Sequence, residues 1–100
     1  MLKYMGENDD FKILTSNRCL VDFYADWCGP CQMIAKELET LSYERTDLDI
    51  IKVNTDKFQT LALKMGVMSI PALFIMENGE VIEKHTGFMT KDEIINFVNR

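Results

Sequence analysis

The chain has 100 residues, 47% of them hydrophobic and 27% charged, a balance typical of one globular domain and unlike that of a disordered protein. Eleven basic side chains stand against 16 acidic ones, which gives a net charge of −5. Without a basic block the chain lacks the positive surface that attracts nucleic acid or an anionic membrane, so we expect neither as a partner. The predicted domain covers residues 1–100.

The N-terminal residues contain no apolar core of signal-peptide length, and no stretch approaches the about 18 apolar residues of a membrane span. The three cysteines are few and odd in number, which argues against a structural disulfide framework. We therefore expect a cytoplasmic protein. In a reducing compartment, two cysteines close together are catalytic or bind a metal.

The first half of the chain alternates strand and helix patterns. Residues 19–24 are apolar almost throughout, as in a strand buried on both faces of a sheet, and the period becomes helical at Pro30. The predicted elements are a strand at 2–5, a helix at 11–14, a strand at 19–24, a helix from Pro30 to about Tyr43, and a strand at 50–54.

The second half contains a helix, a hairpin and a closing helix. Asn78-Gly79 is a strong signal for a two-residue hairpin turn, and Thr90 with Glu93 forms a capping-box pattern. Asp56 and Gln59 form a similar pattern. The predicted elements are a helix at 58–65 that stops at Gly66, a strand at 73–76, an edge strand at 81–86 and a last helix after Thr90. Together they predict a mixed α/β sheet with helices on both faces.

The sequence Trp27-Cys28-Gly29-Pro30-Cys31 places two thiols three positions apart where a strand leads into a helix. Such thiols can close into a small disulfide ring, and Pro30 suits the first helical turn because its missing N–H would have no partner there. We expect this junction to lie at an edge of the predicted sheet, where open α/β sheets commonly place their sites.

Metal binding is the main alternative for this cysteine pair. Structural zinc requires four Cys or His ligands, usually in two close pairs. The only further candidates are Cys19, inside a predicted strand, and His85, in the last strand. We interpret Cys19 as a small buried apolar residue and His85 as a surface residue, and we assign no metal site.

Asp22 is a charged residue in an otherwise apolar strand. If its carboxyl is buried, the loss of solvation raises its pKa toward neutrality, and it can then exchange protons with a thiol. The alternative is an exposed carboxylate at the end of the strand.

The chain resembles the thioredoxin family in an ordered set of motifs. These are Val21-Asp22-Phe23, Trp27-Cys28-Gly29-Pro30-Cys31, Ile70-Pro71, Asn78-Gly79 and Gly87. The resemblance runs from about Phe11 to the C-terminus. It implies a thioredoxin fold, with a central five-stranded mixed sheet flanked by four helices, and a protein-disulfide reductase that works by dithiol–disulfide exchange.

The resemblance also implies roles for individual residues. Cys28 is the nucleophile and Cys31 resolves the mixed disulfide, so that the two alternate between dithiol and redox disulfide. Asp22 moves the proton of Cys31, and Lys52 is the partner of Asp22. Pro71 follows a cis peptide bond. The expected docking patch for clients consists of Trp27, Gly29, Pro30, Ile70, Pro71 and Gly87, although Trp27 has a core-packing alternative.

The resemblance implies a monomeric electron carrier for cell redox homeostasis that holds no cofactor of its own. By the same resemblance, we expect NADPH to reduce it indirectly through a thioredoxin reductase. Expected clients include ribonucleotide reductase, peroxiredoxins and methionine sulfoxide reductases. Two other interpretations remain open: a non-catalytic thioredoxin-fold interaction module, or a specialised relative that serves one client. Tyr24 departs from the family, many of whose members have a second tryptophan there.

Overall fold

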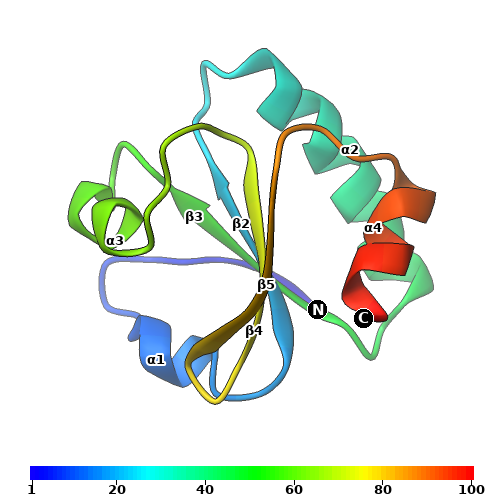
Figure 1. Cartoon of the computed structure of the whole chain (residues 1–100), viewed down its shortest axis with the longest axis horizontal. Coiled ribbons are helices and arrows are strands. Elements are labelled where there is room, and N and C mark those ends of the chain that lie inside the picture. Colours follow the sequence, from blue (N-terminus) through cyan, green and yellow to red (C-terminus); the bar gives the residue numbers. More distant parts are fainter.

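The computed structural model describes residues 1–100, which form five strands and four helices. In chain order these are β1 (Leu2–Tyr4), α1 (Phe11–Leu14), β2 (Cys19–Tyr24), α2 (Gly29–Glu44), β3 (Asp49–Asn54), α3 (Gln59–Lys64), β4 (Ala72–Glu77), β5 (Glu80–Thr86) and α4 (Lys91–Val98). Figure 1 shows the sheet between two layers, with α2 and α4 on one side and α1 and α3 on the other. The predicted five-stranded mixed sheet with four helices is confirmed.

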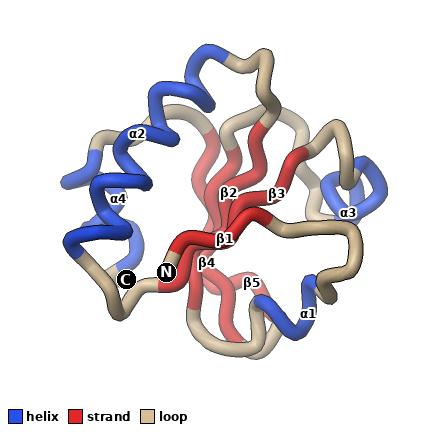
Figure 2. The backbone as a smooth tube through the Cα atoms, turned by 180° about the vertical axis from the view of Figure 1, so that it is seen from behind, coloured by secondary structure: helices blue, strands red, loops and turns tan.

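The strands follow the spatial order β1-β3-β2-β4-β5. The first three run parallel, whereas β4 is antiparallel to β2 and β5 is antiparallel to β4. Helix α2 makes the crossover that joins the parallel strands β2 and β3. Figure 2, from behind, shows β2 and β3 together at the centre of the sheet. The C-terminal end of β2, which leads to the cysteine pair, therefore emerges from the middle of the sheet.

Each face of the sheet has its own apolar core. On the α2 and α4 side, helix α2 buries Ile34, Leu38 and Leu41 against strand residues such as Leu20. The four-residue and three-residue spacings of the helical residues place them on one face, as the sequence period predicted. Burying an aliphatic side chain of this size contributes about 1.5–3 kcal/mol relative to leaving it exposed. These contacts fix the helix that carries the cysteines onto the sheet.

The opposite face packs against the two short helices. This second core contains Cys19, Val21 and Phe23 of β2, together with Ala62 of α3. Because successive strand residues point to opposite faces, Leu20 and Asp22 lie on the α2 and α4 side. Asp22 is thus the one charged side chain that β2 directs into the first core.

The helix ends agree with the sequence signals, with one exception. The Thr90–Glu93 capping box is formed, with both reciprocal hydrogen bonds present. The predicted Asp56–Gln59 cap of α3 is wrong, because α3 begins at Gln59 and Phe58 occupies the N-cap position without a side-chain hydrogen bond. The side chain of Asn54 instead accepts hydrogen bonds from the N–H groups of Asp56 and Lys57. These bonds form a separate turn before the helix starts.

The β4–β5 hairpin turns at Asn78 and Gly79, as predicted. Both residues have positive φ, 56° and 73°, which two-residue hairpin turns of this hand require. Their N–H groups donate to the carbonyl oxygens of Ser16 and Thr15. The tip of the hairpin is therefore fixed to the loop that follows α1.

Candidate active site

The cysteine pair lies at the N-terminus of the longest helix. Cys28 is the N-cap residue of α2, and its sulfur accepts a hydrogen bond of 3.2 Å from the N–H of Cys31. The two cysteines form a disulfide, with Cα atoms 5.2 Å apart. The partial positive charge of a helix N-terminus and a direct N–H donor both stabilise a thiolate at the N-cap position. The location thus favours ionisation of Cys28 in the reduced protein.

Trp27 forms an exposed wall beside the pair. Its side chain is 71% exposed, so it does not pack in the core. The indole Nε1 donates a hydrogen bond of 2.9 Å to Oδ2 of Asp56, which lies in the turn after β3. This bond limits the orientations of the ring. The sequence patterns did not single out Asp56 as the partner of Trp27, because nothing in them brings that turn beside Trp27.

The loop before β4 approaches the cysteines from another direction. The Ile70–Pro71 peptide bond is cis, as the resemblance implied. The Sγ atom of Cys28 lies 3.9 Å from the carbonyl oxygen of Ile70, and the carbonyl of Pro71 accepts a 2.8 Å hydrogen bond from the N–H of Gly87. Ile70, Pro71 and Gly87, which are distant in sequence from Cys28, are therefore gathered around one edge of the site.

Asp22 and Lys52 form a buried ion pair on the face of the sheet that α2 and α4 cover. They are direct neighbours across β2 and β3, their Oδ2 and Nζ atoms are 3.5 Å apart, and their side chains are 0% and 3% exposed. Burial raises the pKa of the Asp22 carboxyl to about 6, against the opposing effect of the Lys52 charge. The alternative of an exposed carboxylate is therefore wrong. Neither oxygen of Asp22 accepts a hydrogen bond.

A small hollow of about 170 Å³ is lined by one member of the ion pair, Lys52, and by one cysteine, Cys31. It is bounded by side chains from β1, β2, β3 and the first turns of α2. Its lining residues are Tyr4, Tyr24, Ala25, Asp26, Cys31, Gln32, Ala35 and Lys52. The hollow gives Cys31 and Lys52 a common boundary, with room for small groups such as water.

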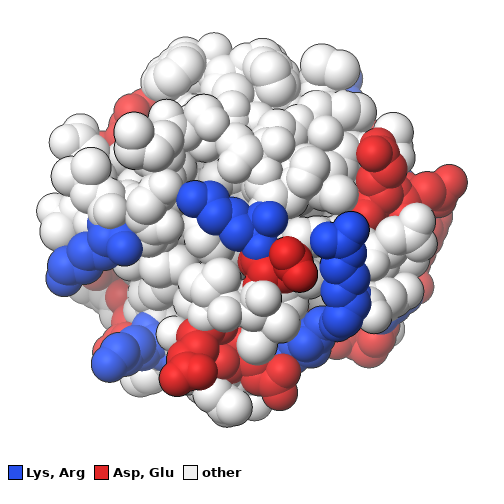
Figure 3. Space-filling model, in the orientation of Figure 1, with Lys and Arg blue, Asp and Glu red and all other residues white.

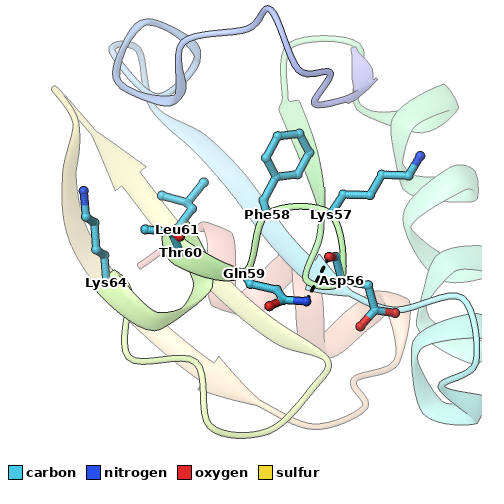
Figure 4. Close-up of a pocket in the computed structure, with 7 residues that line it drawn as sticks. All are labelled: Asp56, Lys57, Phe58, Gln59, Thr60, Leu61 and Lys64. Atoms are coloured by element: carbon cyan, nitrogen blue, oxygen red, sulfur yellow. Dashed lines mark hydrogen bonds between the residues drawn. The ribbon is translucent and has the colours of Figure 1, made fainter.

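The largest surface hollow, about 520 Å³, lies elsewhere. It is formed by a single stretch of chain at the turn into α3, and Gln59 Nε2 donates to the carbonyl of Asp56 within it (Figure 4). Of its lining residues, Asp56 is hydrogen-bonded to Trp27 of the cysteine motif, but no cysteine lines the hollow. We therefore assign the chemistry to the region beyond the C-terminal end of β2, where Cys28 lies, and not to this hollow.

The two side chains considered as additional metal ligands lie in different environments. Cys19 is 2% exposed and packs in the second core, whereas the half-buried ring of His85 packs edge-on against Phe97 at 6.1 Å. No three His, Cys, Asp or Glu side chains come together in a way that could hold a metal ion. None of the helices combines the length and the apolar character needed to cross a membrane.

The family model described as Thioredoxin matches residues 3–100. The chain belongs to the thioredoxin family. A thioredoxin of Bacillus subtilis is 49% identical over 82 residues, which cover 81% of this chain and 79% of that relative. A thioredoxin of Haemophilus influenzae is 42% identical over 105 residues, covering 100% and 98% of the two chains.

Solved thioredoxin structures agree with the same assignment. A mutant thioredoxin from Halobacterium salinarum superposes with a TM-score of 0.88 at 35% identity, covering 98% of this chain and 88% of the other. The oxidised thioredoxin from Plasmodium falciparum gives 0.84 at 26% identity, covering 99% and 96%. With its Cys28–Cys31 pair, the chain is a thiol–disulfide oxidoreductase of this family.

Proposed function

We propose that residues 1–100 form a single thioredoxin domain that reduces disulfides of client proteins in the cytoplasm, with Cys28 as the nucleophile and Cys31 as the resolving thiol. The observation that carries this assignment of roles is the Cys28 sulfur at the N-cap of α2, within 3.2 Å of the N–H of Cys31. A thiolate at that position is stabilised without a cofactor.

The proposed reaction has two exchange steps. The Cys28 thiolate attacks one sulfur of the client disulfide, a new S–S bond joins Cys28 to the client, and the first client thiolate leaves. The thiol of Cys31 then loses its proton and attacks Cys28 Sγ. The Cys28–Cys31 disulfide forms, the second client thiolate leaves, and the client has gained two electrons. Protons from solvent complete the two client thiols.

Asp22 is proposed to accept the proton of Cys31, with Lys52 as its partner. A carboxyl whose pKa is raised to about 6 is largely ionised near neutral pH, yet it holds a proton more readily than an exposed aspartate. The 3.5 Å separation of Lys52 Nζ and Asp22 Oδ2 supports a partnership in which the ammonium favours the carboxylate. The hollow shared by Cys31 and Lys52 provides room for a water that carries the proton.

The proposed docking patch surrounds Cys28 and consists of Trp27, Gly29, Pro30, Ile70, Pro71 and Gly87. Supporting it, the upper part of the molecule in Figure 3 is largely free of Lys, Arg, Asp and Glu side chains, and Figure 1 locates the start of α2 and the loop into β4 there. An uncharged surface with one projecting indole suits an extended client backbone next to a disulfide.

The oxidised protein must be reduced again before a second turnover. We propose that a thioredoxin reductase does this with electrons from NADPH, and that the protein acts as a monomer and holds no cofactor. The partners are then the reductase on one side and disulfide-containing clients on the other, through the same Cys28 sulfur.

Insulin-disulfide reduction driven by dithiothreitol tests the assignment of roles. We expect the wild type and a Cys19→Ser control to accelerate the reaction, and Cys28→Ser to lose the acceleration. Activity that survives in Cys28→Ser would overturn the mechanism and favour an interaction module. Reduction of the Cys28–Cys31 disulfide by a bacterial thioredoxin reductase and NADPH, followed as NADPH consumption, tests the proposed recharging partner.

A further inference from the structure

A row of side chains crosses the sheet at the level of the ion pair. Tyr4 of β1 is the direct neighbour of Lys52 in β3, and Lys52 is in turn the direct neighbour of Asp22 in β2. Directly opposed residues of adjacent strands point to the same face. Tyr24 lies two residues after Asp22 and so points to this face as well. The ammonium of Lys52 is thus surrounded by one carboxyl and two phenol rings.

The two rings are arranged around the ammonium. Lys52 Nζ lies 4.6 Å from the centre of the Tyr24 ring and 5.3 Å from that of Tyr4. The rings meet edge to face, with centres 6.1 Å apart and planes at 82°. A cation within about 6 Å of a ring face is attracted by the negative charge of the π system, and this attraction grows when the cation is removed from water. Both rings meet this distance.

The rings matter because nothing directional holds the ammonium beside Asp22. Neither carboxyl oxygen accepts a hydrogen bond, and the 3.5 Å contact is a charge interaction. A lysine has a long flexible stem that readily extends its charged end toward water. The 170 Å³ hollow lined by Lys52, Tyr4 and Tyr24 offers such a direction. Attraction to the two rings opposes this movement.

We propose that Tyr4 and Tyr24 are positioning residues whose rings hold the Lys52 ammonium next to Asp22 and so favour the ionised carboxyl. The consequence for catalysis, a base ready to take the proton of Cys31, rests on the proposed function. The location of the Lys52 ammonium is independent of the proposed function, because it can be measured in the oxidised protein without any reaction. Tyr24, which stands where many family members have a tryptophan, would then contribute to the location of this ammonium.

Few other ionisable groups lie around the ion pair. Asp26 follows β2 and lines the same hollow, as does Cys31 from α2, which is held in the disulfide in the oxidised protein. On the β4 side, the direct neighbour of Asp22 is the apolar Leu73, followed across the sheet by His85. A change in the titration of Asp22 after substitution of Tyr4 or Tyr24 therefore reports chiefly on Lys52.

The test compares leucine and phenylalanine at each tyrosine. Leucine removes the ring, whereas phenylalanine keeps it and removes only the hydroxyl. The measurement is the pH titration of the Asp22 carboxyl carbon by NMR in the oxidised protein. We expect Tyr4→Leu and Tyr24→Leu each to raise the pKa of Asp22 by about half a unit, the size of one cation–π contact, and the phenylalanine variants to match the wild type.

A Lys52→Met background separates this role from a general packing effect. Without the ammonium, removal of a ring should move the Asp22 titration by less than about 0.2 unit, whereas a packing change would move it as much as before. Urea unfolding of each variant confirms that it is folded. Tyr4 is 54% exposed at the sheet edge, so its leucine variant keeps most core contacts even if Tyr24→Leu is too unstable.

Unchanged titration in both leucine variants would overturn the proposal, as would equal shifts with and without Lys52. A failure of the proposed function would give a different experimental result from a failure of this proposal. If Asp22 takes no part in resolving the mixed disulfide, Asp22→Ala resolves it at the wild-type rate, but the leucine variants still shift the titration of Asp22.

Discussion

Asp22 and Lys52 face each other across the two central strands, with Oδ2 and Nζ 3.5 Å apart and both side chains withdrawn from solvent. A buried charge pair of this kind returns little stability, because the loss of hydration of both ions offsets their attraction. The absence of hydrogen bonds to the carboxyl adds to this cost, because nothing replaces the water that its oxygens have lost. We therefore interpret the pair as a feature kept for chemistry and not for stability.

Replacement of Asp22 by asparagine should change how stability depends on pH. In the native protein the pKa of Asp22 is raised to about 6, above the ordinary value that it takes in the unfolded chain. The native state thus binds this proton more tightly than the unfolded chain does, so the bound proton stabilises the native state at low pH. This stabilisation is lost as the pH rises from about 4 to about 6. Over this window the free energy of unfolding should fall by about 2 kcal/mol more in the wild type than in Asp22→Asn.

Urea unfolding of the oxidised proteins at a series of pH values measures this difference. Asp26→Asn is the matched control, because Asp26 is an exposed carboxyl close in sequence. It should follow the wild-type curve. Parallel curves for the wild type and Asp22→Asn would contradict the raised pKa.

Cys31→Ser should trap the proposed reaction halfway. Cys28 can still attack a client disulfide, but no thiol remains to resolve the mixed disulfide. We expect a covalent protein–client adduct by non-reducing electrophoresis and mass spectrometry, joined through Cys28 and released by dithiothreitol. The double variant Cys28→Ser/Cys31→Ser should form none. An adduct joined through Cys19 would contradict the assignment.

Removal of the Asp56 carboxyl should free the indole of Trp27. Because Trp27 is the only tryptophan, its emission reports directly on this side chain. Asp56→Ala removes the acceptor of the 2.9 Å hydrogen bond, and we expect lower fluorescence anisotropy and a KM for insulin several-fold higher, with a smaller change in kcat.

Asp56→Asn keeps an acceptor oxygen and serves as the control for this substitution. It should restore most of the anisotropy. Wild-type anisotropy in Asp56→Ala would mean that the hydrogen bond does not restrain the ring.

Cys19 should stay unreactive although it is a free thiol. Burial, together with the nearby negative charge of Asp49, raises the pKa of Cys19 to about 11, and the side chain is 2% exposed. Since the thiolate is the reactive form, native alkylation near pH 8 should be about two orders of magnitude slower at Cys19 than at an exposed cysteine. Mass spectrometry after iodoacetamide treatment of the reduced protein should show Cys19 unmodified, and modified only after denaturation. Modification of Cys19 in the native protein would contradict its burial.

The elements of the fold could be predicted from local patterns because each carries its own signal. The apolar run at Cys19–Tyr24, the change of period at Pro30 and the Asn78-Gly79 turn all depend on neighbours in sequence, and the structure has them at nearly those residues. The predicted cap at Asp56 was wrong although it also rested on a local pattern. The side chain of Asn54, two residues earlier, accepts a hydrogen bond from the N–H of Asp56 and forms a turn there instead.

The cysteines were visible in the sequence, whereas much of their surroundings depends on strand register and loop packing. That Tyr4 opposes Lys52 follows from the pairing of β1 with β3, and no local pattern reports that register. Likewise, the bond between Trp27 and Asp56 joins two loops 29 residues apart. The resemblance supplied Ile70, Pro71 and Gly87, which physical reasoning from the residues alone would not have brought next to Cys28.

Both chain ends lie far from the cysteine pair. The N-terminal ammonium donates to the carbonyl of Leu48, just before β3, and Arg18, just before β2, donates to the carbonyl of Arg100. Cys28 follows the opposite end of β2, and Figure 1 shows the two termini together, away from the start of α2. A protein immobilised on a resin or an electrode through either terminus would therefore present its cysteine pair outward, toward whatever flows past.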